Sequence, residues 1–428
     1  MVGYPPMPPI VSKIVERRLS EVVRQRMAHE PVIILYGPRA VGKSTLLAAL
    51  ARSVGREIID LDDLPTRDAV RADPNLFVRG DPPVIIDEFQ HAPELLDAIK
   101  AELNRDASPG RFVITGSTQY ATLPAAAQAL TGRAHRLDVR PLSQGEADEV
   151  HERFAEILLG DPSSLVTAAP ATITRDEYVS RVVAGGFPMA LRRPTPTDRA
   201  RWFDDYVELV LERDVLELTR VRQRQQLPRL LQQLASQTGQ TLNIATAAAA
   251  IGMDKSTAEN YTKLLEAVFL VHRLPAWGTT LGSRVGAAPK IHMVDSGLAA
   301  RLLRLTSGKL AAASAQALTE FGHLLETFVV GEACKQLDWL EEPTNRGHWR
   351  THDGDEIDLV VERHDGKVSA VEVKAGSRVR GGDLDGLMKL RRRLGAQFLG
   401  GVVLYTGARS YTLEHQIHVV PVERLWRS

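Results

Sequence analysis

Residues 32–45, VIILYGPRAVGKST, join a short apolar run to a glycine-rich turn and the start of a helical stretch. The turn fits the pattern G-x-x-x-x-G-K-[ST] in full, from Gly37 to Ser44, and lies between a predicted strand and a predicted helix. Glycines let such a backbone curl so that its N–H groups and the helix N-terminus face phosphate oxygens. The stretch therefore predicts a phosphate-binding loop, with an ordinary glycine-rich turn as the alternative.

The residues of this loop have separate expected roles. We expect Lys43 to reach the β- and γ-phosphates of a nucleotide, and the Ser44 hydroxyl to take one position around Mg²⁺. A later apolar run ends in Ser117 and Thr118, where a sensor of the γ-phosphate would lie, or where a strand simply passes into a loop. The residues expected to bind the nucleotide are Gly37, Pro38, Arg39, Ala40, Val41, Gly42, Lys43, Ser44, Thr45 and Ser117.

An acidic pair ends another apolar run, VIIDE at 84–88. Carboxylates at the end of a buried strand are costly unless they meet a cation. We expect Asp87 to hold Mg²⁺ together with Ser44, and Glu88 to polarise the attacking water. The alternative is a solvated strand end. Lys43, Asp87 and Glu88 are thus the predicted catalytic centre.

Short apolar runs alternate with helical stretches as far as residue 142. Runs that are apolar on both faces and separated by helices are typical of a parallel sheet covered by helices. We therefore predict an α/β fold, with a nucleotide-binding domain over residues 1–160 and a boundary near the small-residue and proline stretch 160–172. The runs are VIILYG (32–37), EIIDLDD (57–63), PVIIDE (83–88), RFVITGS (111–117) and HRLDVRPL (135–142).

Residues 173–310 are predicted to form a helical, winged-helix domain. A helix, a glycine-containing turn, a second helix and an apolar strand follow one another over 228–275. Such a unit either contacts duplex DNA or connects two other domains. The few basic residues of the segment are matched by acidic ones: Lys255, Lys263 and Arg273 against Asp254, Glu259 and Glu266.

The last part of the chain, 311–428, carries a second acidic set. Glu372 and Lys374 are two apart on a predicted strand and so share a face, Asp358 lies on the neighbouring run, and Glu326 lies on the preceding helix. Carboxylates can hold Mg²⁺ or Mn²⁺ against a scissile phosphate while a lysine orients water. This set resembles the PD-(D/E)xK nuclease signature, which implies an α/β restriction-endonuclease-like fold. The alternative is a hairpin with charged outer positions.

A basic helix follows this set and carries Lys389, Arg391, Arg392 and Arg393. Such a helix either faces phosphates or is a solvated charged surface.

Several segments together resemble prokaryotic AAA-family ATPases that carry a C-terminal domain of unknown function. The resemblance runs from about residue 14 to residue 406 and implies ATP and Mg²⁺ as ligands, with ATP preferred over GTP. By similarity, Arg133 would contact the γ-phosphate in cis or in a neighbouring copy of a homo-oligomer, and Arg213 is the second candidate; a surface ion pair is the alternative for either. Segments carrying the resemblance are GPRAVGKSTLL, VIIDEFQHAPELLDAIK, LTGRAHRLDVRPLSQGE, RWFDDYVELVLERDV and PKIHMVDSGLAARLL.

Composition limits the remaining possibilities. The 428 residues include 53 basic and 53 acidic side chains, so net charge does not favour nucleic acid as a partner, although a local basic patch is compatible with it. The single cysteine, Cys334, excludes an internal disulfide and a thiolate zinc cluster. No apolar run approaches the roughly 20 residues that span a bilayer, and MVGYPPMPPI lacks a signal-peptide core, so we expect a cytoplasmic protein without a membrane partner.

Two hypotheses follow for the whole chain. In the first, a Mg²⁺-dependent ATPase drives a nuclease-like domain that acts on or binds DNA or another nucleic acid. In the second, the chain is a nucleotide-dependent switch whose nuclease-like domain is inactive and binds a protein partner.

Overall fold

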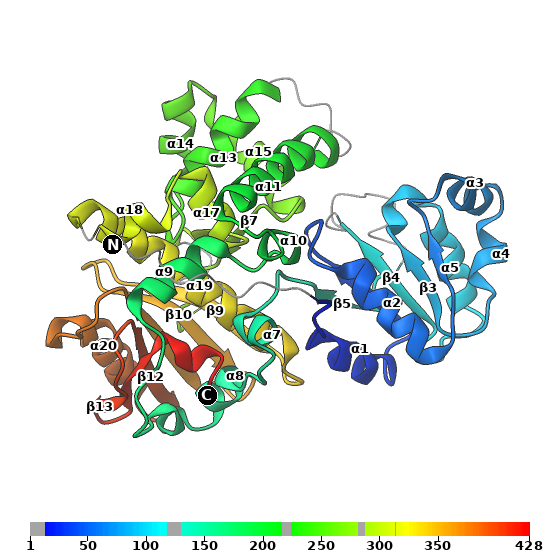
Figure 1. Ribbon diagram of the computed structural model, residues 1–428. Helices are drawn as coiled ribbons and strands as arrows, with labels where there is room; N and C mark the ends of the chain where they lie inside the picture. The colour runs from blue at the N-terminus through cyan, green and yellow to red at the C-terminus, as the bar shows by residue number, and fades with distance from the viewer. Residues whose placement is uncertain (1–12, 118–129, 216–223, 281–286, 313) are drawn as a thin grey trace.

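Three sheets organise the computed structural model, which describes residues 13–117, 130–215, 224–280, 287–312 and 314–428. In Figure 1 the first sheet lies at the right and the C-terminal sheet at the lower left, while the small sheet lies among the helices of the middle of the chain, above the C-terminal sheet. No helix among the described residues is both long and apolar enough to cross a membrane.

The first sheet is parallel throughout, with the order β2-β3-β4-β1-β5. Its strands are β1 (Val32–Tyr36), β2 (Ile58–Asp60), β3 (Val84–Asp87), β4 (Phe112–Gly116) and β5 (Ala134–Asp138). Both faces of β1 carry apolar side chains and are therefore buried. Ile33 and Leu35 pack against one helix layer, and Val32 and Ile34 pack against the other.

The two helix layers come from different parts of this domain. On one face lie α1 (Leu19–Met27) and α2 (Lys43–Val54), and on the other lie α3 (Leu64–Ala72), α4 (Pro74–Val78) and α5 (Leu95–Leu103). The predicted α/β fold with helices on both faces is thereby confirmed.

The middle of the chain is mainly helical. Its elements are α9 (Arg175–Ala184), α10 (Pro188–Leu191), α11 (Pro196–Leu209), a π-helical segment (Val210–Asp214), α13 (Leu227–Ser236), α14 (Ile244–Ile251), α15 (Lys255–Ala267), α17 (Ser296–Leu302) and α18 (Ser307–Ala311). Gly252, at φ +68°, ends α14, and Asp254 caps α15 by accepting from the Thr257 N–H at 3.1 Å.

A small antiparallel sheet has one strand before this helix–turn–helix and two after it. It contains β6 (Gln240–Thr241), β7 (Val271–Leu274) and β8 (Lys290–Met293), in the order β6-β8-β7. The order of elements is the expected one, and the winged-helix assignment stays a prediction.

The C-terminal region combines one long helix with a mixed sheet. Helix α19 (Ala315–Trp339) covers one face of the sheet, and α20 (Asp385–Leu394) covers the other. The strand order is β13-β14-β12-β11-β10-β9. The strands are β9 (Thr344–Arg350), β10 (Glu356–Arg363), β11 (Val368–Lys374), β12 (Phe398–Tyr405), β13 (Tyr411–Glu414) and β14 (Ile417–Pro421). The predicted hairpin is confirmed, since β10 and β11 pair antiparallel.

A short linker helix, α8 (Phe154–Gly160), packs on this C-terminal sheet although it precedes the middle helices in sequence. The backbone carbonyls of Leu158 and Leu159, in α8, accept hydrogen bonds from Ser369 at 2.6 Å and Arg363 at 2.9 Å. The division of the chain at residues 160, 173 and 311 stays a prediction for its folding units.

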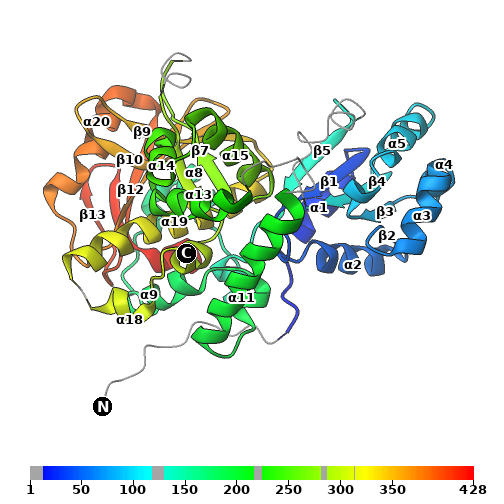
Figure 2. The same ribbon diagram turned by 90° about the horizontal axis from the view of Figure 1, so that it is seen from above.

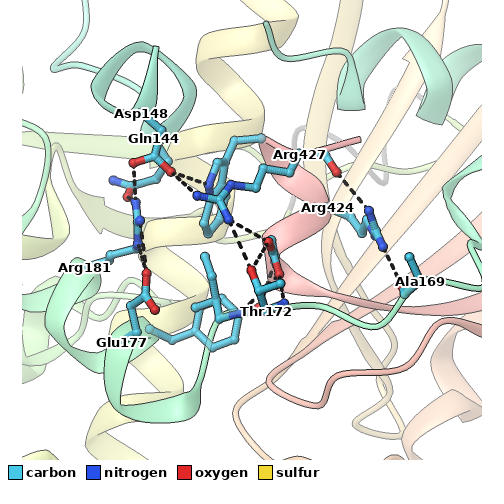
Figure 3. A network of polar contacts seen from close by, with 12 residues as sticks. Gln144, Asp148, Ala169, Thr172, Glu177, Arg181, Arg424 and Arg427 are labelled. Carbon is cyan, nitrogen blue, oxygen red and sulfur yellow. Dashed lines mark hydrogen bonds and ion pairs between the residues drawn. The ribbon is translucent and has the colours of Figure 1, made fainter. Parts of the chain in front are cut away.

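The last residues of the chain contact Asp148 and Ala169, which precede the middle helices in sequence (Figure 3). Asp148 accepts hydrogen bonds from Arg181 at 3.0 Å and from Arg427 at 3.1 Å, while Arg424 donates to the Ala169 carbonyl at 2.9 Å. The neighbouring Trp426 is fully buried. These contacts join the end of the chain to Asp148 and Ala169 and, through Asp148, to Arg181 of α9.

Candidate functional site

Two glycines, Gly37 and Gly42, occupy positions of the phosphate loop that disfavour a side chain. Gly42 lies at φ +94° immediately before α2, and a side chain at Gly37 would meet the Val139 carbonyl oxygen at 2.1 Å. Ala40, at φ +61°, shares the left-handed conformation. The curl directs the N-terminus of α2 towards the loop, as phosphate binding requires.

Lys43 folds back across this loop and is 4% exposed. Its Nζ donates to the carbonyls of Gly37 and Pro38, both at 3.0 Å, and lies 3.9 Å from a Glu88 carboxylate oxygen. Burial lowers the pKa of Lys43, and the charges of Glu88 and Asp87 only partly oppose this. Because nearby carboxylates offset the cost of burying this ammonium only in part, an added anion such as a phosphate would stabilise its charge.

Asp87 lies at the carboxyl end of β3, where its carboxylate contacts Thr115, Glu88 and Ser44. Its carboxylate accepts hydrogen bonds from the Thr115 hydroxyl and from the Glu88 N–H, the latter at 3.1 Å. Burial raises the pKa of Asp87 against hydrogen bonds from Thr115 and Ser44. Ser44 and Asp87 therefore offer a hydroxyl and a buried carboxylate side by side, a donor set that fits Mg²⁺.

Glu88 is held by a residue that the sequence analysis missed. Gln90 donates to the Glu88 carboxylate and, at 2.9 Å, to the Ser117 hydroxyl, so it joins the predicted base to the predicted sensor. Burial opposes ionisation of Glu88, but Lys43, Gln90 and Arg39 outweigh it and lower the pKa. The position of Gln90, two residues beyond Glu88, was the signal in the sequence that could have indicated this contact. Thr118, which the sequence analysis placed next to Ser117, lies outside the described residues.

The middle helices reach the loop through one ion pair. Nε of Arg39 lies 2.7 Å from both carboxylate oxygens of Asp214, which is 2% exposed and ends the π-helical segment after α11. Figure 2 shows α11 on the side of the middle helices that faces the first sheet. Arg213, next to Asp214, is exposed. The loop thus has a direct contact with the second region of the chain.

A pocket of about 270 Å³ opens beside the loop. Besides loop residues and Glu88, it is lined by Ile14, Val15 and Arg17 before the first sheet and by Met189 and Arg192 of the middle region. Both regions therefore contribute walls next to the phosphate site.

Arg133 lies far from the loop within its own chain. It precedes β5, whose first residue, Ala134, is paired with Val32 at the start of β1, whereas the loop follows the last residue of β1. Its guanidinium donates to Asn104 at 2.7 Å. The structure does not bring Arg133 to the phosphate loop, so contact in cis is not supported and contact with a neighbouring copy stays a prediction.

Two of the four predicted C-terminal residues, Glu326 and Asp358, meet at a lysine that the sequence analysis missed, and the other two, Glu372 and Lys374, pair with each other. Nζ of Lys290, on β8, lies 2.7 Å from Glu326, 2.8 Å from Asp358 and 2.5 Å from Glu356. Glu372 pairs with Lys374 at 2.9 Å. The available signal was a lysine within the apolar strand 290–293.

An ammonium lies among the carboxylates that the sequence analysis expected to hold a divalent metal. No group of three or more His, Cys, Asp or Glu side chains that could hold a metal ion occurs in the part of the chain that the structure describes. Burial acts to lower the pKa of Lys290, but Asp358, Glu326 and Glu356 outweigh it and raise the pKa. The expected convergence of carboxylates is therefore present, with an ammonium at its centre.

The basic residues proposed to face phosphate are largely engaged within the chain. On α20, Lys389 pairs with Asp355, Arg391 donates to the His415 carbonyl, and Arg393 donates to Thr279 at 3.1 Å. These contacts favour a structural role for the helix over a nucleic-acid surface.

In the middle region, Arg273 contacts Glu259 at 3.0 Å and Glu266 at 3.3 Å. The sequence analysis noted that acidic residues match the basic residues of this segment. At Arg273 the structure shows this match as direct ion pairs.

Comparison with protein families divides the chain into three matched parts. Residues 29–147 match the model of an AAA domain, residues 175–309 match a domain of unknown function (DUF8612), and residues 321–425 match another (DUF4143). Together with the parallel sheet and the phosphate loop, the first match identifies an AAA-type nucleotide-binding ATPase domain. The C-terminal match carries no assignment as a nuclease.

Two relatives are similar over nearly the whole chain. They are proteins named as uncharacterized from Mycobacterium bovis and Mycobacterium tuberculosis, each 28% identical over 422 residues, which is 96% of this chain and 85% of theirs.

Solved structures with a detectable likeness include a Walker-type ATPase of Pyrococcus abyssi and the RuvB Holliday junction branch migration motor of Thermotoga maritima. The first has 15% identity and a TM-score of 0.41, covering 70% of this chain and 98% of that one. The second has 16% identity and a TM-score of 0.29, covering 63% and 93%.

Proposed function

We propose that this chain hydrolyses ATP with Mg²⁺ at the phosphate loop and passes the state of the nucleotide to its middle region. The observation that carries the proposal is the position of the buried Lys43 ammonium across the phosphate loop, with the Glu88 carboxylate 3.9 Å away at the end of β3. A phosphate group and an attacking water are the partners that these two side chains suit.

The roles of the residues follow from their contacts. Lys43 exchanges the carbonyls of Gly37 and Pro38 for β- and γ-phosphate oxygens. Ser44 and Asp87 hold Mg²⁺, which neutralises phosphate charge when bound. Glu88 accepts a hydrogen bond from the attacking water, and Gln90 fixes the orientation of the Glu88 carboxylate.

Arg39 supplies the proposed link to the rest of the chain. It belongs to the phosphate loop and pairs with Asp214 of the middle region, so nucleotide phosphates and Asp214 compete for one guanidinium. Binding of ATP would then weaken the ion pair and shift the middle region relative to the loop.

We also propose self-association when ATP is bound. Arg133 is remote from the phosphate loop of its own chain, and a neighbouring copy is the remaining route to a γ-phosphate. Light scattering of the Glu88→Gln variant with ATP and Mg²⁺ measures this, and a strict monomer at saturating ATP would exclude it.

The C-terminal region has two candidate functions. It is either a nuclease-like domain that acts on or binds nucleic acid, or an inactive relative of one that binds a protein partner. The ammonium of Lys290 among the carboxylates favours the second. We therefore prefer a nucleotide-dependent switch, located in the cytoplasm, over an active nuclease.

Steady-state ATP turnover of the full chain, with and without DNA, tests the main proposal. We expect Mg²⁺-dependent turnover by the wild type and by the control Glu94→Gln, which alters a half-buried glutamate at the start of α5 that lies 3.6 Å from Arg71. A purified, folded chain that hydrolyses no ATP under either condition would refute it. Turnover stimulated strongly by DNA would favour the nucleic-acid candidate over the switch.

A further inference from the structure

A buried lysine and three carboxylates meet where the middle region touches the C-terminal sheet. Lys290 is 1% exposed, and its Nζ contacts Glu326 of α19 and both Glu356 and Asp358 of β10 within 2.5–2.8 Å. An ammonium has three N–H donors and no acceptor. Each donor therefore has one carboxylate, and the lysine is fully satisfied by residues of another part of the chain.

The position of this ammonium is the one that a metal ion would need. Glu326 and Asp358 belong to the acidic set that the sequence predicts to bind a divalent cation, and Nζ lies in contact with both. A divalent metal bound by these oxygens at about 2.0–2.6 Å would overlap the ammonium. The lysine and the metal are thus alternatives for one place.

One further side chain points to a cation at this place. Nε2 of His292 is buried, has no hydrogen-bond partner among the described residues and lies 4.0 Å from Oε1 of Glu326. With its proton on Nδ1, which lies 3.2 Å from the Thr327 hydroxyl, this imidazole would leave Nε2 as an acceptor beside Glu326.

The strand that carries Lys290 is firmly fixed. Leu274 of β7 pairs with Lys290, and the segment after β7 donates from the Trp277 N–H to the His348 carbonyl at 2.6 Å. His348 in turn contacts the Ala288 carbonyl at 3.1 Å, two residues before the lysine. Strand pairing and hydrogen bonds therefore hold the backbone at Lys290, and this fixes where its side chain begins.

We propose that Lys290 is a built-in cation that closes the acidic site of the C-terminal region to divalent metal, and that removing its ammonium converts the same residues into a Mn²⁺ site. The proposal concerns metal binding and does not depend on ATP hydrolysis. It explains how a set of carboxylates can be retained together without a metal: the charge of Lys290 offsets their repulsion.

Mn²⁺ binding to the full chain without nucleotide, measured by calorimetry, tests the proposal. We expect Lys290→Met to bind one more Mn²⁺ per chain than the wild type, while Lys290→Arg, which keeps a cation, binds no more than the wild type. The double variant Lys290→Met with Asp358→Asn should lose the added site. ATP turnover of each sample, measured in parallel, reports separately on the phosphate loop.

Two results would overturn the proposal. One is Mn²⁺ binding by the wild type that Asp358→Asn removes, and the other is a folded Lys290→Met variant that gains no site. If Lys290→Met folds neither with nor without Mn²⁺, the comparison of the wild type with Asp358→Asn decides. Equal Mn²⁺ binding by those two then supports a closed site.

Discussion

Two buried lysines, Lys43 and Lys290, show how differently one side chain is used in this molecule. Lys43 contacts two carbonyl oxygens at 3.0 Å and a carboxylate only at 3.9 Å, and its pKa is lowered. Lys290 contacts three carboxylates within 2.5–2.8 Å, and its pKa is raised. The first ammonium can still gain from an anionic ligand, whereas the second is already neutralised.

The difference lies in what surrounds each lysine rather than in burial. Both side chains are less than 5% exposed, so desolvation disfavours both charges. At Lys43 the nearest oxygens belong to a loop that glycines keep open to phosphate, and at Lys290 they belong to a helix and a strand of a packed domain. An incompletely paired charge thus indicates a ligand site, and a completely paired one indicates a structural contact.

The largest effect is expected from Lys43→Ala. Loss of the ammonium removes the side-chain cation that folds across the loop toward the phosphates, so ATP binding should fall below detection in calorimetry. Lys290→Arg is the matched control, because it alters the other buried lysine and should leave ATP binding unchanged. Tight ATP binding by Lys43→Ala would show that the two lysines do not differ in the way described.

Glu88→Gln should have the next largest effect. The amide keeps the shape and the contact with Gln90 but cannot accept a proton, so turnover should fall by about 100-fold or more while ATP still binds. Single-turnover kinetics separate the two steps. Equal turnover by wild type and variant would remove Glu88 from its role and leave Lys43 without a catalytic partner.

A smaller effect is expected at the contact between loop and middle region. Asp214→Asn releases the Arg39 guanidinium for the nucleotide, so ATP affinity should rise by about 5-fold, within the usual range for coupling between sites. Asp204→Asn, which breaks an exposed pair with Arg301, is the control on the same helix. No change, or weaker ATP binding, would argue against competition for Arg39.

The sequence predicted the parts of the sites that are local and missed those that are brought together by folding. The phosphate loop and the Asp87–Glu88 pair lie within short motifs, because the chemistry there requires fixed spacing along one loop or strand. Asp214 lies 175 residues from Arg39, and Lys290 lies 68 residues from Asp358. No motif marks such partners, since only the packing of helices and strands decides which charges meet.

Arg133 is a different case, because its place could be read from the predicted strands. A position in a resembling segment suggested a γ-phosphate contact, but the register of β1 and β5 puts Arg133 at the other end of the sheet. The predicted parallel sheet already placed Arg133 before a strand, whereas the loop follows a strand, so the two lie at opposite edges within one chain.

The smallest effect on ATP hydrolysis is expected from Lys374→Ala. Lys374 pairs with Glu372 and Asp383 in the C-terminal sheet, so ATP turnover should stay within about 2-fold of the wild type because the two sites share no partner. With Lys290 in the place of a metal, we expect neither wild type nor Lys374→Ala to nick single- or double-stranded DNA in Mn²⁺. Nicking by the wild type that Lys374→Ala abolishes would show that the acidic site admits metal after all. The C-terminal region would then be a nuclease, and the contrast between an open lysine at the loop and a closed one at the carboxylates would fail.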